Sequence, residues 1–229
     1  MPNEIRIPSP SFAPLRSRLK GSVMDDPFTR GRYATDASIY QMMPHAVVVP
    51  ETLGDVEATL DFAREQGIAV LPRGGGTSQC GQTVNHAVVI DTSKHLNRIL
   101  ELDVEGCRCL VEPGIVLDEL NRQLKPHGLW FPVDVSTSSR ATIGGMAGNN
   151  SCGGRSIRYG MMRDNVTAID AILSDGSTAR FGDVVSTSPS GLLKSCSRAC
   201  WRWARPIAPT FWTAFQKCFG ALAATIWMR

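Results

Sequence analysis

A run of three glycines directly after an apolar stretch limits most strongly what this chain of 229 residues can fold into and hold. The segment Pro72–Gly81 reads Pro-Arg-Gly-Gly-Gly-Thr-Ser-Gln-Cys-Gly. Without Cβ atoms, consecutive glycine N–H groups can approach an anion closely. Arg73 adds a fixed positive charge, and Thr77 and Ser78 add hydroxyl donors. A diphosphate suits this loop, although an isolated glycine triplet can also be a plain wide turn.

Two common phosphate-binding motifs do not describe this loop. No Gly-Lys-Ser/Thr follows the glycines, so the segment is not a P-loop. Gly74 and Gly76 fit the dinucleotide fingerprint of a Rossmann unit, but position 79 is Gln and no helical pattern begins there. The sequence therefore disfavours nicotinamide binding in the usual manner.

A second glycine-rich segment, Ala141–Gly154, reads Ala-Thr-Ile-Gly-Gly-Met-Ala-Gly-Asn-Asn-Ser-Cys-Gly-Gly. Its glycines would let the chain pass flat against a ligand, and the amides of Asn149 and Asn150 can both donate and accept hydrogen bonds. The same small residues also suit a tight turn that packs against a helix. Two such segments in one chain favour a ligand site.

The apolar pattern predicts an α+β fold with mixed sheets. Thr52 is expected to cap a helix that ends at Gly67, between two strands of a parallel crossover unit. Asp175-Gly176 is expected to form a hairpin turn. The expected strands are 46–50, 68–71, 87–91, 99–102, 108–111, 166–173 and 177–181, the expected helices are 52–67 and 115–125, and residues 1–45 read as an N-terminal arm.

The motifs together resemble one known family. In order, the chain has Leu-Pro-Arg-Gly-Gly-Gly-Thr-Ser, a Pro-Val-Asp turn, Thr-Ile-Gly-Gly-Met-Ala-Gly-Asn-Asn-Ser-Cys-Gly, and Arg-Tyr-Gly. This order resembles the PCMH-type FAD-binding domain of the vanillyl-alcohol oxidase/p-cresol methylhydroxylase superfamily, and is most similar to its D-lactate, glycolate and D-2-hydroxyglutarate dehydrogenases. The resemblance covers about residues 40–183 and implies an FAD-binding domain of two α/β subdomains at 46–183. In this family the substrate-carboxylate ligands and the active-site base lie in a later cap domain, so no catalytic residue is assigned.

The resemblance also implies cofactor contacts. Arg73–Ser78 would wrap the FAD diphosphate, Pro132 and Asp134 would form a turn beside the flavin, and the second glycine segment would line the diphosphate and the isoalloxazine. Backbone N–H groups of the Gly144–Asn150 loop would stabilise charge on the flavin. Some relatives attach FAD through a His, and Thr77 in the loop implies non-covalent binding instead. The implied cofactor-binding residues are Arg73, Gly74, Gly75, Gly76, Thr77, Ser78, Gly81, Pro132, Asp134, Thr142, Ile143, Gly144, Gly145, Ala147, Asn149, Asn150, Tyr159, Gly160 and Val166.

The last 46 residues have a different composition from the rest of the chain. Residues 184–229 contain four of the five Trp and no Asp or Glu. If the reading frame is shifted one base upstream, the codons of residues 215–220 permit the peptide Phe-Pro-Lys-Val-Phe-Arg. The codons of residues 224–229 then permit Gly-Tyr-Asn-Leu-Asp-Ala. These resemble the stretch that follows this lobe in long, iron–sulfur-containing family members. We therefore expect 184–229 to be a frameshifted tail, its residues from about 190 to lie outside the native fold, and the chain to be truncated before the cap domain.

The implied activity is oxidation of a D-2-hydroxy acid by hydride transfer to flavin N5, with a small hydroxy acid as substrate and an unidentified electron acceptor. The alternatives are an FAD-linked oxidase of a sugar lactone or an aromatic alcohol, or an FAD-binding remnant without turnover. The net charge of +3 is too small to indicate nucleic acid, and the four histidines read as structural or surface residues. The cysteine spacing does not indicate a metal site, so an iron–sulfur cluster would belong to the missing part. The odd cysteine count and the absence of a signal sequence favour the cytoplasm, with membrane association only through electron-transfer partners.

Overall fold

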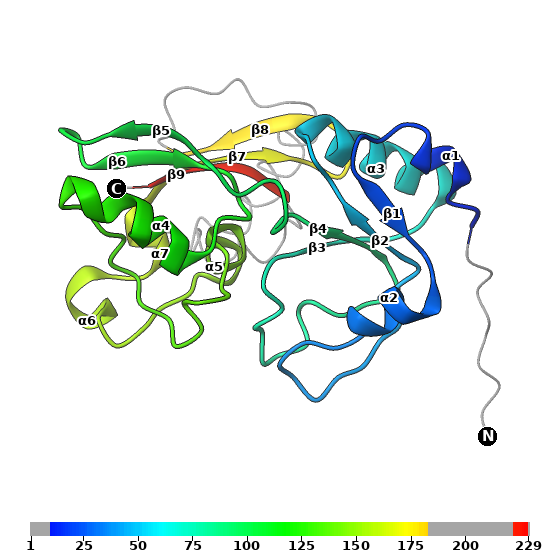
Figure 1. The fold of residues 1–229 in the computed structure, drawn as a ribbon, viewed down its shortest axis with the longest axis horizontal. Coiled ribbons are helices and arrows are strands. Elements are labelled where there is room, and N and C mark those ends of the chain that lie inside the picture. The colour runs from blue at the N-terminus through cyan, green and yellow to red at the C-terminus, as the bar shows by residue number, and fades with distance from the viewer. Residues whose placement is uncertain (1–9, 183–221, 229) are drawn as a thin grey trace, which may run out of the picture. The chain divides into compact units, whose positions relative to one another are not determined.

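The computed structural model describes residues 10–182 and, as backbone, residues 222–228 (Figure 1). The chain divides into two compact units. The first contains Met1–Pro72 and Ser78–Asp91, and the second contains Arg73–Thr77 and Thr92–Arg229. This division agrees with the two α/β subdomains expected from the sequence.

A four-stranded mixed sheet forms the centre of the first unit. Its strand order is β1-β2-β4-β3, with β1 antiparallel to β2, and β2 parallel to β4. The elements are α1 (Ala13–Arg16), β1 (Ser22–Met24), α2 (Pro27–Arg32), β2 (Ala46–Val49), α3 (Leu53–Gln66), β3 (Val70–Arg73) and β4 (Val88–Asp91). The strands that α3 connects are therefore not neighbours, because β4 lies between them. The arm expected at 1–45 contributes β1 to this sheet.

Local signals account for α3. Thr52 accepts a hydrogen bond from the Asp55 N–H, the Asp55 side chain completes a capping box, and Gly67 ends the helix in the left-handed conformation. The buried face of α3 includes Phe62, which packs with Phe12 and Leu15 of the arm against the sheet. Both predicted ends of this helix are confirmed.

A five-stranded sheet forms the centre of the second unit, in the order β5-β6-β9-β7-β8. Its neighbouring strands all run antiparallel. The strands are β5 (Ile99–Asp103), β6 (Arg108–Val111), β7 (Val166–Ile172), β8 (Thr178–Phe181) and β9 (Leu222–Met228), and the helices are α4 (Leu117–Leu124), η1 (Lys125–His127), α5 (Ile143–Asn149), α6 (Ser156–Tyr159) and α7 (Met162–Asn165). The hairpin turn at Asp175-Gly176 joins β7 to β8 as predicted, with Gly176 at φ 83°.

Strand β9 differs from the expectation for the tail. It pairs with β6 on one side, where Leu110 lies opposite Trp227, and with β7 on the other, where Ile169 lies opposite Ile226. The open edges of β6 and β7 present backbone N–H and C=O groups with which a further strand can pair. The expectation that no residue beyond about 190 joins the fold is therefore not met by Leu222–Met228, while 183–221 lie outside the described residues.

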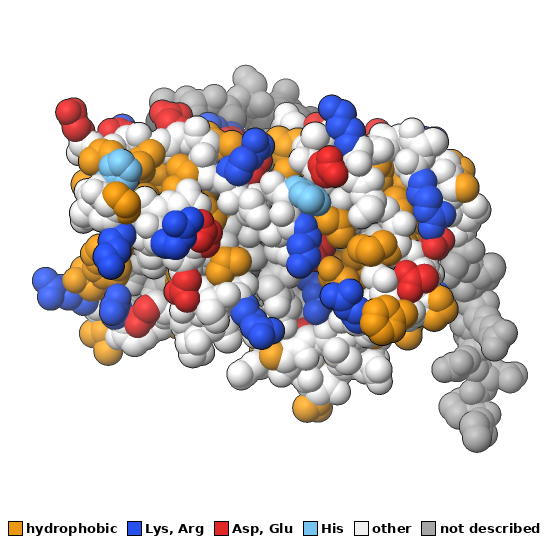
Figure 2. Space-filling view, in the orientation of Figure 1, with side chains coloured by type: hydrophobic (Ala, Val, Ile, Leu, Met, Phe, Trp, Pro, Cys, Tyr) orange, Lys and Arg blue, Asp and Glu red, His pale blue; other side chains and the backbone are white. Residues whose placement is uncertain are grey.

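One hydrophobic core lies beside this second sheet. Leu117, Leu120 and Leu124 of α4 are buried, as their helical spacing predicts, together with Ile143 and Met146 of α5. The second glycine segment was expected to be a flat loop, and this expectation is wrong for Ile143–Asn149, which form α5. On the face shown in Figure 2, acidic and basic side chains lie interspersed, in keeping with the small net charge.

Candidate functional site

The two glycine-rich segments contact each other within the second unit. A Cβ on Gly74 would overlap the Thr142 side chain, and one on Gly75 would lie 2.9 Å from the carbonyl carbon of Arg140 and closer still to its oxygen. Only glycine at these two positions leaves room for the Thr142 side chain and the Arg140 carbonyl. The sequence predicted both segments as parts of one site, and the structure brings the triplet against the chain that leads into α5.

The glycine triplet has backbone donors available for an anion. Among residues 10–182, no hydrogen bond uses the backbone N–H of Gly74, Gly75 or Gly76. Gly76 adopts φ +64°, and the Arg73 guanidinium lies beside its Cα, where a Cβ would come within 2.6 Å of Nη2. Successive N–H groups beside a fixed cation form a suitable cradle for a diphosphate. This arrangement fits the cofactor that the sequence implied.

The N–H groups at the start of α5 are used by the protein itself. Gly144 donates to the Pro113 carbonyl at 2.8 Å, Gly145 donates to Thr142 Oγ1 at 3.3 Å, and Met146 donates to the Thr142 carbonyl at 2.8 Å. At the other end of the helix, Asn150 donates to the Ala147 carbonyl. The expectation that this loop presents backbone N–H groups to the flavin is therefore wrong for these residues, because they close and cap a helix.

Asp134 organises the chain that follows α5. Its carboxylate accepts a hydrogen bond from the Arg155 N–H at 2.9 Å, and its carbonyl occupies the space that a Cβ on Gly153 would need. The Arg155 guanidinium lies 3.9 Å from the same carboxylate. Asp134 thus fixes the start of α6 and lies beside the second glycine segment, and its place beside the flavin stays a prediction.

The remaining predicted residues occupy different environments. Ile143 and Ala147 are buried in the core, Val166 packs against that core, and Asn150 accepts a hydrogen bond from the Arg163 N–H at 3.0 Å. Gly145, Asn149 and Tyr159 are exposed. Ser78 and Gly81 belong to the first unit, where Gly81 at φ +69° packs against the Tyr40 ring, and Thr77 stays with the triplet in the second. Pro132 and Gly160 are half-buried.

Two residues outside the predicted set position the glycine segments. Pro113 holds Gly144 through its carbonyl, and its Cβ would lie 2.6 Å from a Cβ on that glycine. The Arg140 carbonyl packs against the Cα of Gly75. The Pro113-Gly114 pair carries a turn signal that could have indicated a tight approach, whereas nothing in the sequence around Arg140 could have done so.

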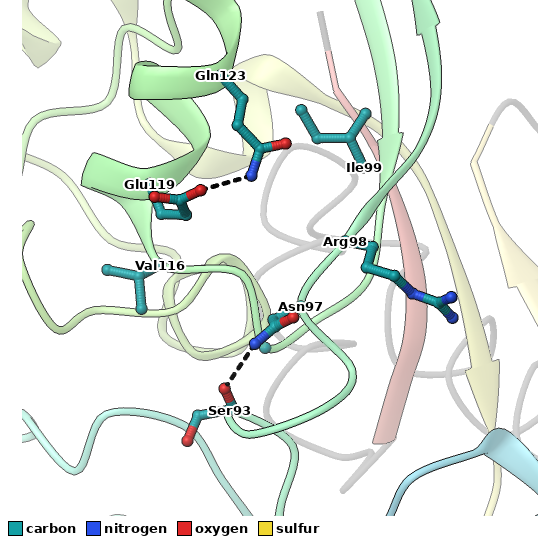
Figure 3. Close-up of a pocket in the computed structure, with 8 residues that line it drawn as sticks. Ser93, Asn97, Arg98, Ile99, Val116, Glu119 and Gln123 are labelled. Carbon is teal, nitrogen blue, oxygen red and sulfur yellow. Dashed lines mark hydrogen bonds between the residues drawn. The ribbon is translucent and has the colours of Figure 1, made fainter.

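A separate hollow of about 460 Å³ lies between the start of β5 and α4 (Figure 3). Its polar groups bond to one another: Gln123 donates to Glu119, and Asn97 donates to the Ser93 carbonyl. Hydrogen bonds from Arg122 and Gln123 lower the pKa of Glu119 to about 2. The lining residues are Ser93, Asn97, Arg98, Ile99, Gly114, Val116, Glu119 and Gln123. None of them belongs to the predicted cofactor set, and the glycine triplet remains the better candidate because its donors are unsatisfied.

The mixed α/β fold and the glycine triplet suit an FAD-binding domain, and comparison with known proteins agrees. The family model of the FAD binding domain matches residues 44–182, so the chain belongs to this family. The resemblance inferred from the motifs is therefore confirmed, and the domain is one that binds FAD.

The chain is also similar to individual proteins of known name. The chain is 42% identical over 163 residues to D-2-hydroxyglutarate dehydrogenase of Pseudomonas putida, covering 70% of this chain and 16% of that protein. It is 34% identical over 161 residues to glycolate oxidase subunit GlcD of Bacillus subtilis, covering 69% and 34%. It also shares the fold of 6-hydroxy-D-nicotine oxidase from Arthrobacter nicotinovorans, with a TM-score of 0.71 at 19% identity, covering 96% of this chain and 44% of that one. The chain thus spans about a sixth of the length of the D-2-hydroxyglutarate dehydrogenases that it matches.

The part of the chain that the structure describes contains no group of three or more His, Cys, Asp or Glu side chains arranged to hold a metal ion. No helix in that part has both the length and the apolar character needed to cross a membrane.

Proposed function

We propose that this chain is the flavin lobe of an FAD-dependent dehydrogenase that oxidises a D-2-hydroxy acid of the 2-hydroxyglutarate, lactate or glycolate type. The observation that carries the proposal is the triplet Gly74–Gly76, whose three N–H groups have no partner among residues 10–182. The identity of about 40% with D-2-hydroxyglutarate dehydrogenases supports the substrate class.

In this proposal the triplet binds the diphosphate of FAD. Its N–H groups donate to phosphate oxygens, and the Arg73 guanidinium, which already lies beside Gly76, neutralises part of their charge. Thr142 and Arg140 keep the triplet in place from the other side. Bound FAD would supply a hydride acceptor at N5 for the Cα hydrogen of the substrate.

The second glycine segment, Ala141–Gly154, contributes to the proposed site mainly by placing the exposed residues of α5. Since its first N–H groups are already bonded, α5 presents the exposed Gly145 and Asn149 rather than a row of open amides. Asn149 is the side chain of this helix that reaches solvent with both a donor and an acceptor, and its Nδ2 bonds to Ser151 Oγ at 3.2 Å. We assign Asn149 to the polar edge of the flavin, and Tyr159 and Gly160 to the chain that closes over it.

The FAD is held without a covalent bond. Some relatives attach FAD through a His, whereas the segment 73–81 contains no His and has Thr77 in the loop. The odd number of cysteines suits the reducing cytoplasm, where we place the protein.

Reconstitution with FAD tests the proposal. The purified chain should retain flavin after gel filtration, and acid precipitation should release the flavin into the supernatant. Arg73→Gln should weaken FAD binding by about 10- to 100-fold, the worth of one charge-assisted hydrogen bond. Arg32→Gln, an exposed arginine of the first unit, serves as the matched control and should leave the affinity unchanged. Equal FAD affinity in Arg73→Gln and the unchanged chain would remove the triplet as the diphosphate site.

A second candidate function is that of an FAD-binding module without turnover. The family match over residues 44–182 supports FAD binding, and none of the predicted site residues has a catalytic role. Reduction of a redox dye, stimulated by D-2-hydroxyglutarate, D-lactate or glycolate, separates the two. Flavin binding without dye reduction would favour the module.

A further inference from the structure

An exposed group of aromatic, aliphatic and arginine side chains surrounds α6. Ile157 is 100% exposed, Trp130 is 44% exposed and Tyr159 is 38% exposed. We call these residues, with Arg155 and Arg158, the α6 patch. Large apolar side chains grouped on a surface indicate a contact with another molecule.

The aromatic rings of the α6 patch are already held in place. Trp130 and Tyr159 meet edge to face with ring centroids 5.3 Å apart. The Arg155 guanidinium lies 5.2 Å from the Trp130 ring, and that of Arg158 lies 5.3 Å from the Tyr159 ring. Side chains fixed in this way lose little conformational entropy when a partner binds.

The charge of the α6 patch is positive. Residues 151–163 contain three arginines and no acidic residue. The Arg155 guanidinium forms an ion pair with the Asp134 carboxylate at 3.9 Å, and the Arg163 guanidinium forms one with the Asp164 carboxylate at 3.6 Å. Arg158 has no carboxylate within ion-pair distance among residues 10–182, so it can pair with an acid from outside. In the view of Figure 2, basic and hydrophobic side chains lie together where Figure 1 places α6.

We propose that the α6 patch is a docking surface for a partner protein segment that carries carboxylates beside apolar side chains. Trp, Tyr and Arg are the residues that most often dominate the binding energy of protein interfaces. Ile157 would enter an apolar contact of the partner, and Arg158 and Arg155 would pair with its carboxylates. Tyr159 also belongs to the proposed flavin site, so docking is assigned to Ile157, Arg155 and Arg158, none of which belongs to the predicted cofactor set.

A protein segment fits the patch better than a nucleic acid does. Bases stack on open aromatic faces, but arginines lie over both rings and the rings meet edge to face. The fully exposed side chain of Ile157 also has no counterpart in phosphate recognition. Both features suit an apolar and acidic peptide.

Two synthetic peptides test the proposal on the full chain. A labelled peptide that alternates Glu-Glu with Leu-Leu should bind, with an affinity that falls as salt rises, and the corresponding Lys-Lys and Leu-Leu peptide should not bind. Ile157→Asp and Arg158→Glu should each weaken binding at least tenfold, roughly the loss expected at a dominant interface residue. Neither residue belongs to the predicted cofactor set, and Ile157 is too exposed for its replacement to disturb the fold.

Matched variants in the first unit provide the control. Ile39 is 94% exposed and Arg32 is exposed, yet neither belongs to the α6 patch. Ile39→Asp and Arg32→Glu should leave peptide binding unchanged. The proposal fails if the acidic peptide does not bind, if the control variants weaken binding as much as the patch variants, or if single-stranded DNA displaces the peptide and binds the patch more tightly.

Discussion

The Cα of Gly75 faces the carbonyl group of Arg140 so closely that a Cβ would lie 2.9 Å from its carbon and overlap its oxygen. The same glycine is exposed on its other side. One residue thus serves two purposes, because it lets the triplet pack on the chain before α5 and leaves the loop open to a ligand. From sequence alone, the replacement of Gly75 should harm FAD binding more than the apo fold. The contact with Arg140 changes that expectation.

Gly75→Ala should therefore destabilise the protein even without FAD. Overpacking against a backbone carbonyl costs about 1–3 kcal/mol, which corresponds to a fall in Tm of roughly 2–10 °C for a domain of this size. Differential scanning calorimetry of the apo and FAD-loaded forms gives the measurement. Gly148→Ala is the matched control, since a Cβ there meets nothing within 4 Å in a helix, and it should be neutral or stabilising by about 0.5–1 kcal/mol. An apo Tm for Gly75→Ala equal to that of the unchanged chain would contradict the packing role.

Thr142→Ala should remove both the N-cap of α5 and the contact with Gly74. The Thr142 hydroxyl accepts the Gly145 N–H, and the side chain fills the space beside Gly74. We expect a loss of about 1–2 kcal/mol in the free energy of unfolding, measured by urea denaturation. Thr142→Ser keeps the hydroxyl and should recover most of this loss. If both variants lose the same amount, the methyl group rather than the cap is responsible.

Asp55 should make the stability of the first unit depend on pH. Burial raises the pKa of this carboxyl, but hydrogen bonds from the backbone N–H groups of Lys20, Glu51, Gly21 and Thr52 outweigh burial and hold the pKa below its usual value. Because the folded-state pKa is lowered, this stabilisation is complete above the unfolded-state pKa of about 4 and is lost as the pH falls through the folded-state pKa.

Asp55→Asn should accordingly cost about 2–4 kcal/mol near pH 7, since an amide replaces an ionised acceptor of four donors. The difference between Asp55→Asn and the unchanged chain should shrink as the pH falls below about 4. Denaturation at several pH values provides the test. A difference that is the same at acid and neutral pH would show that the carboxylate charge is not what stabilises this contact.

The structure and the sequence lead to opposite predictions of what happens when the tail is removed. If β9 holds β6 and β7 together, a chain that ends at residue 221 should lose thermal stability and aggregate through its two open strand edges. If the tail is a frameshifted segment without a place in the fold, a chain that ends near 183 should be more soluble and equally stable. Limited proteolysis and calorimetry of both shortened chains distinguish these outcomes, and the nucleotide sequence after codon 183, read in all frames, tests the frameshift directly.

Sequence was enough wherever a structure depends on neighbouring residues. The capping box of Thr52 and Asp55, the left-handed Gly67 and the turn at Asp175-Gly176 each follow from contacts within a few positions. The leucine spacing of α4 likewise predicted its buried face. The order of the glycine motifs gave the family and the cofactor class, since that order reflects a phosphate-binding geometry that few other residues can adopt.

Tertiary structure decided what depends on distant partners. Three glycines in seven residues oppose a helix, yet α5 forms because Thr142 caps it and the carbonyls of Pro113 and Ile115 accept its first N–H groups. The insertion of β4 beside β2, and of β9 between β6 and β7, also involves hydrogen bonds between segments far apart in the chain. The sequence by itself therefore predicted which residues hold a diphosphate. Only the tertiary structure decided which backbone N–H groups are left without a hydrogen bond. Those of the triplet have no carbonyl group within reach among residues 10–182, whereas the first N–H groups of α5 donate to the carbonyls of Pro113 and Ile115.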